Sequence, residues 1–408
     1  MAFLSLLDER IRAKGSRDPL GFEPVWTSFG RRLVGNLTTV TSSWRNVAVA
    51  LLGFYWCNDL CRDTPEKDKL KTLQAYFIRY EQLAAYLRCL DSDSPGEILG
   101  ITRVRQNLRD ESGRVTLGTT AKHLILSDQI SYGLWGLYSS AMRATDLVRG
   151  DYRLPTDHGS SIAERMEARL DTSAFIAPIK GVRDELAHQE LAKLQPEFLA
   201  AIEQPEVQSS LIDSLLSGST DHALQKALSS ATKQIELSGS TLGASGYVAA
   251  LRQTNISPEL DTRLSDIESL ERLLVSSNIL FDYCRRKDGK SLNALAANVD
   301  ARIRFDFVPA SPSLSGCRYR SDLEAIRSAL RAGQTKEALV ALFELNCHVM
   351  RDRGGAPWIE LDDREQVRVR INSEVSELCS QKEFETKWHY SYFLESFARI
   401  AAEADSSS

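Results

Sequence analysis

Three polar segments in the first half of the chain carry residue types that suit contact with a phosphate or a nucleobase. The first segment, residues 30–46, reads GRRLVGNLTTVTSSWRN and contributes the candidates Arg31, Arg32, Asn36 and Arg45. Ser42 or Ser43 is a natural N-cap for the apolar stretch that follows, so free backbone N–H groups, a helix dipole and arginines come together. The segment therefore predicts a phosphate site. The alternative is that the hydroxyls only cap the helix and the arginines are solvated.

The second segment, residues 102–120, is rich in arginine. It reads TRVRQNLRDESGRVTLGTT, and its candidate cations are Arg103, Arg105 and Arg109. Clustered arginines of this kind predict contact with the backbone of a nucleic acid. Asp110 and Glu111 lie in the same segment, and a salt-bridged surface helix is the alternative interpretation.

The third segment, residues 127–143, combines a lone carboxylate with aromatic side chains. Asp128 stands in the otherwise apolar stretch LILSDQISYGLW, followed by Tyr132, Trp135 and Arg143. A buried Asp128 would have a raised pKa and could act as a base or stabilise a cation, while the aromatic rings could stack on a nucleobase. The alternative is that Asp128 lies on the wet face of a helix and the aromatic residues belong to the core.

Together the segments predict a nucleic-acid-directed protein, and the most specific form of that prediction is a DNA glycosylase-like enzyme acting on modified bases. Such an enzyme needs a basic face, a pocket for the extruded base and a carboxylate that stabilises positive charge on the sugar. Asp128 is the candidate catalytic carboxylate, and Asn36 is the candidate contact to the base edge or to a water. The candidate nucleic-acid contacts are Arg31, Arg32, Arg45, Arg103, Arg105, Arg109 and Arg143, and the candidate stacking residues are Tyr132 and Trp135.

Signatures of cofactor and metal sites are missing from the sequence. It has no GxxxxGK[ST] or GxGxxG phosphate loop, and no HExxH or GxSxG motif. The six histidines are scattered without metal-ligand spacing, so neither a cofactor nor a metal is expected. The seven cysteines lack the spacing of a disulfide framework, which predicts reduced thiols in the core.

Helical periodicity dominates the chain and predicts a mainly α fold of two lobes. The predicted helices cover residues 43–61, 67–90, 97–109, 122–148, 258–288, 320–332, 335–352 and 378–404, with several more between 160 and 236. Two segments alternate between apolar and polar residues around a five-residue loop, which predicts a β-hairpin of residues 358–361 and 367–371. Residues 302–308 (RIRFDFV) alternate too and are a candidate third strand.

Charge is distributed unevenly over the expected domains. These are a basic helical domain over residues 1–155 and an acidic helical domain over 156–408, with the small β element near 302–371. Residues 1–155 hold 21 basic and 17 acidic side chains, a net charge of +4, whereas the rest of the chain carries −9. The asymmetry permits a first domain that faces a polyanion, and a chance difference is the alternative.

Two of the quoted stretches resemble known sequences. DPLGFEPVWTSFGRRLVGNLTTVTSSWRN and SDQISYGLWGLYSSAMRATDLV are similar to uncharacterised bacterial proteins from mobile or phage-defence gene neighbourhoods, in pattern only and over the first 150 residues. The resemblance implies a role in antiviral defence directed at invading DNA, and it supplies no catalytic residue. The alternative function is a non-catalytic scaffold or adaptor of a multi-component bacterial defence complex, which would have a protein partner.

The sequence also predicts a cytoplasmic protein that does not enter a membrane. The N-terminal apolar stretch runs at once into Asp8 and Glu9, unlike a secretory signal. The longest nearly apolar run, residues 47–57, is much shorter than the roughly 20 residues that a membrane-spanning helix needs.

Overall fold

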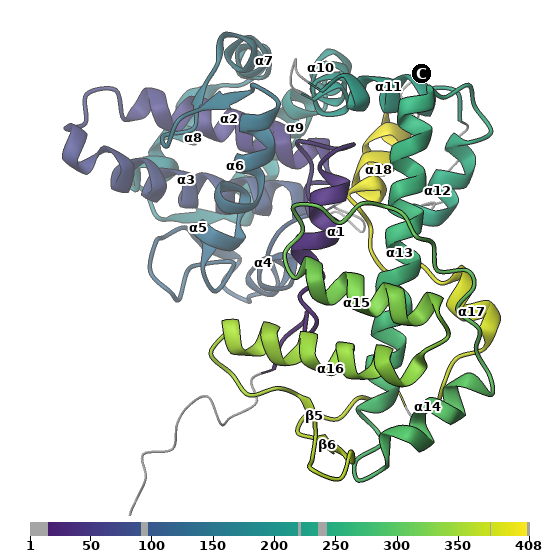
Figure 1. Cartoon of the computed structure of the whole chain (residues 1–408). Helices are drawn as coiled ribbons and strands as arrows, with labels where there is room; N and C mark the ends of the chain where they lie inside the picture. Colours follow the sequence, from purple (N-terminus) through teal and green to yellow (C-terminus); the bar gives the residue numbers. More distant parts are fainter. Residues whose placement is uncertain (1–14, 91–96, 219–221, 236–242, 376, 406–408) are drawn as a thin grey trace, which may run out of the picture. The chain divides into compact units, whose positions relative to one another are not determined.

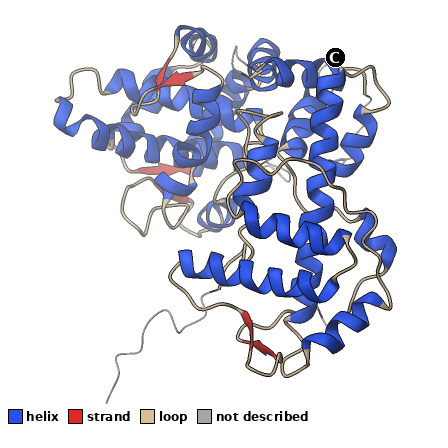
Figure 2. Ribbon diagram, in the orientation of Figure 1, coloured by secondary structure: helices blue, strands red, loops and turns tan. Residues whose placement is uncertain are grey.

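The computed structural model describes residues 15–90, 97–218, 222–235, 243–375 and 377–405. Helices predominate and the strands are short (Figure 2), so the predicted mainly α fold is confirmed. Among the described residues, no helix combines the length and the apolar character that a membrane crossing requires.

Two compact units make up the chain, and each combines separate stretches of sequence. Unit 1 comprises residues 1–33, 243–252 and 256–392, and unit 2 comprises residues 34–242, 253–255 and 393–408. The sequence predicts two consecutive domains, whereas these units are interleaved along the chain. The reason is local packing at both ends, since an early helix packs within unit 1 and a late helix packs within unit 2 (Figure 1).

The core of unit 2 is built on helices α2 (Trp44–Leu60) and α3 (Glu66–Cys89), which pack against each other. Ser43 caps α2, as predicted, by accepting a hydrogen bond from the backbone N–H of Asn46 at 3.3 Å. Most of α2 is buried on every face, as its apolar circumference predicts. Every residue of α3 from Tyr80 to its last turn is buried as well.

Shorter helices and two small antiparallel sheets surround α2 and α3. The remaining helices of unit 2 are α4 (Ile101–Leu108), α5 (Gln129–Tyr132), α6 (Leu134–Ala144), α7 (Asp157–Glu167), α8 (Thr172–Lys180), α9 (His188–Ile202), α10 (Pro205–Ser217), α11 (Ala223–Thr232) and α18 (Leu394–Asp405). The strand pairs are β1 (Arg114–Thr116) with β4 (Glu185–Ala187) and β2 (Val148–Arg149) with β3 (Leu154–Pro155). Helix α18 comes from the far end of the sequence and packs on α10 and α11.

Unit 1 is arranged around the long helix α13 (Pro258–Cys284). Helices α1 (Glu23–Gly30) and α16 (Thr335–Asp352) pack against it. Trp26 of α1 stacks on Tyr390, with the ring centroids 5.8 Å apart. The other helices of this unit are α12 (Ala244–Leu251), α14 (Leu292–Asp300), α15 (Arg320–Arg331) and α17 (Gln381–Thr386).

The predicted hairpin is confirmed. Strands β5 (Ile359–Leu361) and β6 (Val367–Val369) pair antiparallel, with Ile359 opposite Val369 and Leu361 opposite Val367. The loop between them is held by Asp362, whose side chain accepts hydrogen bonds from the backbone N–H groups of Arg364 and Gln366, each at 2.9 Å.

The third strand predicted over residues 302–308 is wrong. Ile303 and Phe305 are buried, as the alternation indicates, but the segment has no neighbouring strand. The side chain of Gln381 instead takes both backbone hydrogen bonds of Arg304, because its Nε2 donates to the carbonyl at 2.9 Å and its Oε1 accepts from the N–H at 2.8 Å. A side-chain amide therefore satisfies the backbone groups that a strand partner would otherwise satisfy.

The single helix predicted over residues 122–148 is wrong. It is interrupted at Gly133, where the extended backbone separates α5 from α6. The side chain of Asp128 caps α5, so helical structure begins only there. The first backbone N–H of α6, that of Leu134, donates to the carboxylate of Glu81 on α3 at 2.6 Å. A partner from another helix thus fixes where α6 starts.

The single helix predicted over residues 378–404 is wrong as well, because residues 387–393 separate α17 from α18. The backbone N–H groups of His389 and Tyr390 donate to the carboxylate of Glu271 on α13. Amides that are held by another helix cannot take part in helical i→i−4 hydrogen bonds, so the helix stops.

Candidate functional site

Asn36, a predicted catalytic residue, is buried in the loop before α2. Its side-chain Nδ2 donates to the carbonyl of Leu215 at 2.8 Å, and its Oδ1 accepts from Nε2 of Gln225 at 2.8 Å. Both ends of the amide therefore hold the loop on α10 and α11. An amide that is used in this way is a packing contact rather than a group that is ready for a ligand.

Asp128, the predicted catalytic carboxylate, is exposed and not buried. It accepts hydrogen bonds from the backbone N–H of Ser131 at 3.0 Å and from the Ser131 hydroxyl at 2.7 Å. These bonds lower the pKa of Asp128 from its ordinary value. Within the described part of the chain, no contact joins Asp128 to Asn36. The structure therefore does not bring the two predicted catalytic groups together.

Three of the seven candidate arginines are paired with acidic or aromatic side chains or are partly buried. Arg31 is half-buried, which lowers its pKa, and Arg32 lies over the ring of Phe29 at 4.2 Å. Both belong to unit 1. Arg45 of unit 2 makes two ion pairs, which are its contacts with Glu203 at 3.0 Å and Glu403 at 2.8 Å.

The other four candidate arginines are exposed, and none of them pairs with a carboxylate of the described residues. They are Arg103, Arg105, Arg109 and Arg143. Three belong to the short amphipathic helix α4 or its C-cap, where Val104 faces the core. Arg103 and Arg105 therefore flank Val104 on opposite sides, and Arg109 follows Arg105 by one turn. We call Arg103, Arg105 and Arg109 the α4 surface.

Tyr132 and Trp135, the predicted stacking residues, lie in different environments. Trp135 is buried and packs edge-on against Phe54 and Phe77, at centroid distances of 5.4 Å in both cases. It belongs to the core of unit 2. Tyr132 is 58% exposed at the end of α5, which makes it an aromatic side chain open to solvent.

Short contacts connect the neighbourhood of Tyr132 to the α4 surface. Arg103 donates through Nη1 to the carbonyl of Leu124 at 2.5 Å. The next residue, Ile125, donates its backbone N–H to the side chain of Gln129 at 3.3 Å, and Gln129 begins the single turn of α5 that ends at Tyr132. Helices α4 and α5 also both pack on α3. The exposed tyrosine and the α4 surface therefore belong to one neighbourhood of unit 2.

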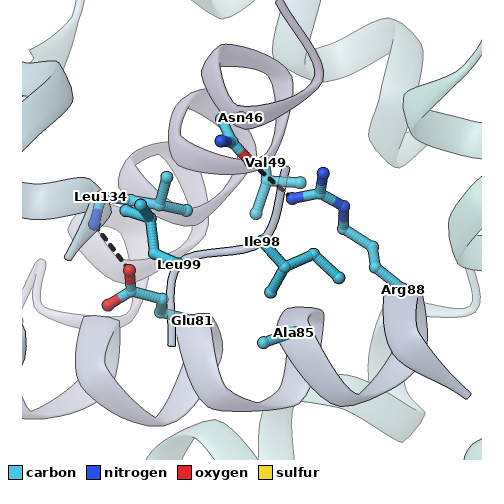
Figure 3. Close-up of a pocket in the computed structure, with 8 residues that line it drawn as sticks. All are labelled: Asn46, Val49, Glu81, Ala85, Arg88, Ile98, Leu99 and Leu134. Atoms are coloured by element: carbon cyan, nitrogen blue, oxygen red, sulfur yellow. Dashed lines mark hydrogen bonds between the residues drawn. The ribbon is translucent and has the colours of Figure 1, made fainter. Parts of the chain in front are cut away.

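A small pocket in unit 2 brings together residues that the sequence did not single out (Figure 3). Helices α2 and α3, the start of α6 and the segment before α4 form its walls, which are lined by Asn46, Val49, Glu81, Ala85, Arg88, Ile98, Leu99 and Leu134. Its free space is about 10 Å³, which corresponds to one water-sized occupant. Two charged side chains, Glu81 and Arg88, lie towards opposite sides of the apolar lining.

Glu81 is a buried carboxylate without a cationic partner among the described residues. It accepts hydrogen bonds from the backbone N–H of Leu134 at 2.6 Å and from Nε2 of Gln129 at 2.9 Å. Burial raises the pKa of Glu81 to about 7, while both hydrogen bonds lower it. Glu81 therefore changes charge near neutral pH, and its hydrogen bond to Leu134 ties that change to the start of α6.

Arg88 is a buried cation whose hydrogen bonds go to neutral oxygens. Nη1 donates to Oδ1 of Asn46 at 2.6 Å, and Nη2 donates to the backbone carbonyl of Glu97 at 3.3 Å. Burial lowers the pKa of Arg88 to about 10, so the group stays positive at neutral pH. Asn46 in turn donates to the hydroxyl of Tyr138 at 2.9 Å, and burial raises the pKa of Tyr138 to about 12.

A signal for this pocket was present in the sequence. Between Tyr80 and Leu90 the stretch YEQLAAYLRCL carries two charges, Glu81 and Arg88, in an otherwise apolar or neutral surrounding. Their spacing of seven residues places them on one face of a helix, about 10 Å apart along its axis. Charges in a buried stretch are informative because buried charges are costly unless they are paired or functional.

Comparisons with known proteins add no name to this site. No family model, no curated protein and no solved structure matches the chain. Within the described residues, no group of three or more His, Cys, Asp or Glu side chains could hold a metal ion. The function must therefore be argued from the surface and the pocket themselves.

Proposed function

We propose that the protein binds single-stranded nucleic acid, DNA in the first instance, through the α4 surface and Tyr132. The observation that carries the proposal is the exposure of Arg103, Arg105 and Arg109 without a carboxylate partner among the described residues. Elsewhere in the same unit, arginines such as Arg45 and Arg114 are matched with glutamates. Arg103 donates to the carbonyl of Leu124 and Arg105 to the thiol of Cys89, and the remaining N–H groups of the guanidiniums on this short helix are available to phosphate oxygens.

The exposed tyrosine favours a single strand over a duplex. A base can stack on an aromatic side chain only where it is not already stacked inside a helix, and such stacking tolerates any base. The backbone N–H of Tyr132 donates to the carbonyl of Asp128 at 2.9 Å, so the exposed carboxylate of Asp128, whose negative charge opposes a phosphate, belongs to the same turn. The arrangement therefore fits a ligand whose base contacts the tyrosine while its backbone follows α4.

Base excision receives no comparable support. Its predicted groups were a buried carboxylate at Asp128 and a free amide at Asn36, and neither environment is found. The defence role rests on the sequence resemblance alone. A scaffold in a bacterial defence complex, the alternative function, is favoured by failure of the binding test below.

The proposal is tested by fluorescence anisotropy with a labelled DNA single strand of about 20 nucleotides and with the matching duplex, at low and high salt. We expect the single strand to bind more tightly than the duplex. Three phosphate contacts predict a slope of log affinity against log salt of about −2. Absence of binding at low salt would reject nucleic-acid binding.

A matched pair of variants separates the α4 surface from general charge. Arg103→Gln/Arg105→Gln/Arg109→Gln should abolish most of the binding and flatten the salt dependence. The control variant removes the same charge from exposed arginines outside α4, namely Arg62, Arg169 and Arg331. Equal losses in the two variants would show that net charge, rather than the α4 surface, attracts the strand.

A further inference from the structure

The pocket next to Arg88 has the chemistry of an anion site. Arg88 is only 6% exposed, and the hydrogen bonds of its guanidinium go to uncharged oxygens of Asn46 and Glu97. A guanidinium has five N–H donors, and a buried cation is costly unless an opposite charge compensates it. No carboxylate lies within ion-pair distance of Arg88 in the part of the chain that the structure describes.

The acidic side chains nearest in the network are already occupied. The carboxylate of Glu97 pairs with Arg399 and accepts from the hydroxyl of Ser42 at 3.1 Å. Glu203 and Glu403, which also belong to this region, both pair with Arg45. None of these carboxylates pairs directly with Arg88, and Glu203 favours its positive charge only from a distance.

Glu81 does not neutralise Arg88 either. The two residues lie two turns apart on α3, towards opposite sides of the pocket (Figure 3), and the carboxylate is held by Leu134 and Gln129. The lining between them is apolar, with Val49, Ala85, Ile98 and Leu99 among its members. Apolar walls lower the local polarity, which strengthens a charge interaction inside the pocket.

We propose that the pocket binds one small monovalent anion, of the size of chloride, against the guanidinium of Arg88. The free space of about 10 Å³ matches an occupant close to a water molecule in size. The anion supplies the counter-charge that the described side chains do not supply. Because Arg88 also holds Asn46 of α2 and the carbonyl of Glu97, the bound anion stabilises the junction of α2, α3 and the segment that leads to α4.

Thermal unfolding at constant ionic strength tests the site, with sodium gluconate replaced stepwise by sodium chloride. Gluconate is too large for the pocket, so the replacement changes only the anion that can enter. A ligand that binds the folded state alone raises its stability. We expect the wild-type Tm to rise by about 2–4 °C, to saturate, and to rise similarly with bromide. A wild-type Tm that does not depend on the anion would overturn the proposal.

Variants of Arg88 keep the test decisive. Arg88→Met should remove the chloride dependence while the protein remains folded in gluconate, because the substitution removes the buried charge and retains an apolar side chain of similar length. Arg62→Met, at an exposed arginine, should keep the wild-type dependence. Chloride-35 NMR supplies a second readout, since the line should broaden with wild type and less with Arg88→Met. Broadening that is equal in the two proteins would contradict the assignment to Arg88.

A carboxylate of the chain is the competing occupant. The sequence places Asp91 and Asp93 shortly after Arg88, and the variant Asp91→Asn/Asp93→Asn removes both charges. The proposal expects this variant to show the same chloride dependence as wild type. Chloride dependence that arises only in the variant would assign the counter-charge to the chain and reject the anion site.

Discussion

Two buried glutamates, Glu81 on α3 of unit 2 and Glu271 on α13 of unit 1, occupy similar positions and differ in their surroundings. Burial raises the pKa of each to about 7. Glu271 accepts from the backbone N–H groups of His389 and Tyr390 and from the hydroxyl of Tyr392 at 2.7 Å. Glu81 accepts two hydrogen bonds and lines a pocket that also contains Arg88.

The difference shows that a raised pKa does not by itself mark a binding site. Both carboxylates connect a long helix to a segment distant in sequence, and this role alone accounts for their burial and their hydrogen bonds. Glu271 fulfils that role with three donors. What sets Glu81 apart is the adjoining pocket and a cation that lacks a charged partner among the described residues. The pocket, rather than the pKa, carries the functional argument.

The largest expected effect is on the free energy of unfolding, and its size differs between the two glutamates. Glu271→Ala should lower the free energy of unfolding by about 3–5 kcal/mol, because three donors lose their acceptor in a buried place. Glu81→Ala should cost about 2–3 kcal/mol, because only two donors are left and the pocket can admit water. Urea unfolding measures both values, with the exposed Glu259→Ala as the control. A larger loss for Glu81→Ala would reverse the comparison.

The second prediction concerns the pH dependence of stability, and the same effect is expected for both glutamates. Their folded-state pKa of about 7 lies above the ordinary 4.5, so the folded protein retains protons that the unfolded chain has lost. The free energy of unfolding should therefore fall as the pH rises from 4.5 to 7, by about 3 kcal/mol for each group, and change little from this cause above 7.

Glutamine variants isolate this pH dependence. Glu81→Gln and Glu271→Gln should each remove about half of the fall, and the double variant should remove most of it. Unfolding curves at several pH values measure these slopes. If wild type and the double variant gave parallel curves, neither carboxylate would titrate as its burial predicts.

The third prediction concerns the junction that Glu81 controls. A Cβ at Gly133 would come within 2.3 Å of the backbone carbonyl oxygen of Gln129 and 2.6 Å of the Glu81 carboxylate. Gly133→Ala should therefore displace the start of α6 and cost about 1–3 kcal/mol in urea unfolding. Gly15→Ala, where no atom lies within 4 Å of the added Cβ, is the matched control. If Gly133→Ala left the free energy of unfolding unchanged, the junction would accommodate the added Cβ without loss of stability.

The smallest expected effect concerns the outer surface of unit 2 and not its buried glutamate. Tyr132→Ala should weaken binding of single-stranded DNA by about 5- to 10-fold, whereas Tyr132→Phe should keep most of it, because stacking needs the ring and not the hydroxyl. Anisotropy titrations measure both, and Glu81→Gln serves as a control for effects that come from the interior. Equal losses for Ala and Phe would argue against stacking.

Most of the fold could be predicted from hydrophobic periodicity. Helices α2, α3, α13, α15 and α16 and the hairpin follow from local pattern, and nearby serines, Ser43 and Ser257, cap α2 and α13. The errors arose where a distant side chain replaces a backbone partner. Glu81 interrupts the helix predicted over 122–148, Glu271 interrupts the one over 378–404, and Gln381 replaces a strand beside Arg304.

The candidate site was harder to predict, since residue type does not reveal exposure. Asp128 and Asn36 are polar residues in apolar surroundings, but one lies in solvent and the other holds a loop. Arginines in similar sequence contexts differ in whether a carboxylate pairs with them. Arg45 is paired because Glu203 and Glu403 reach it from segments far along the chain. Glu81 and Arg88 carried the more useful signal, which is charge within a continuous buried stretch.

The exchange of chain ends between the units has a consequence for biosynthesis. Helix α18 packs on α10 and α11, yet residues 243–392 are translated between them. A nascent chain that has emerged from the ribosome as far as residue 242 thus carries an α10 face that still awaits its covering helix. The two units should consequently mature late and nearly together, and a chaperone that shields apolar helices would find its substrate during this interval.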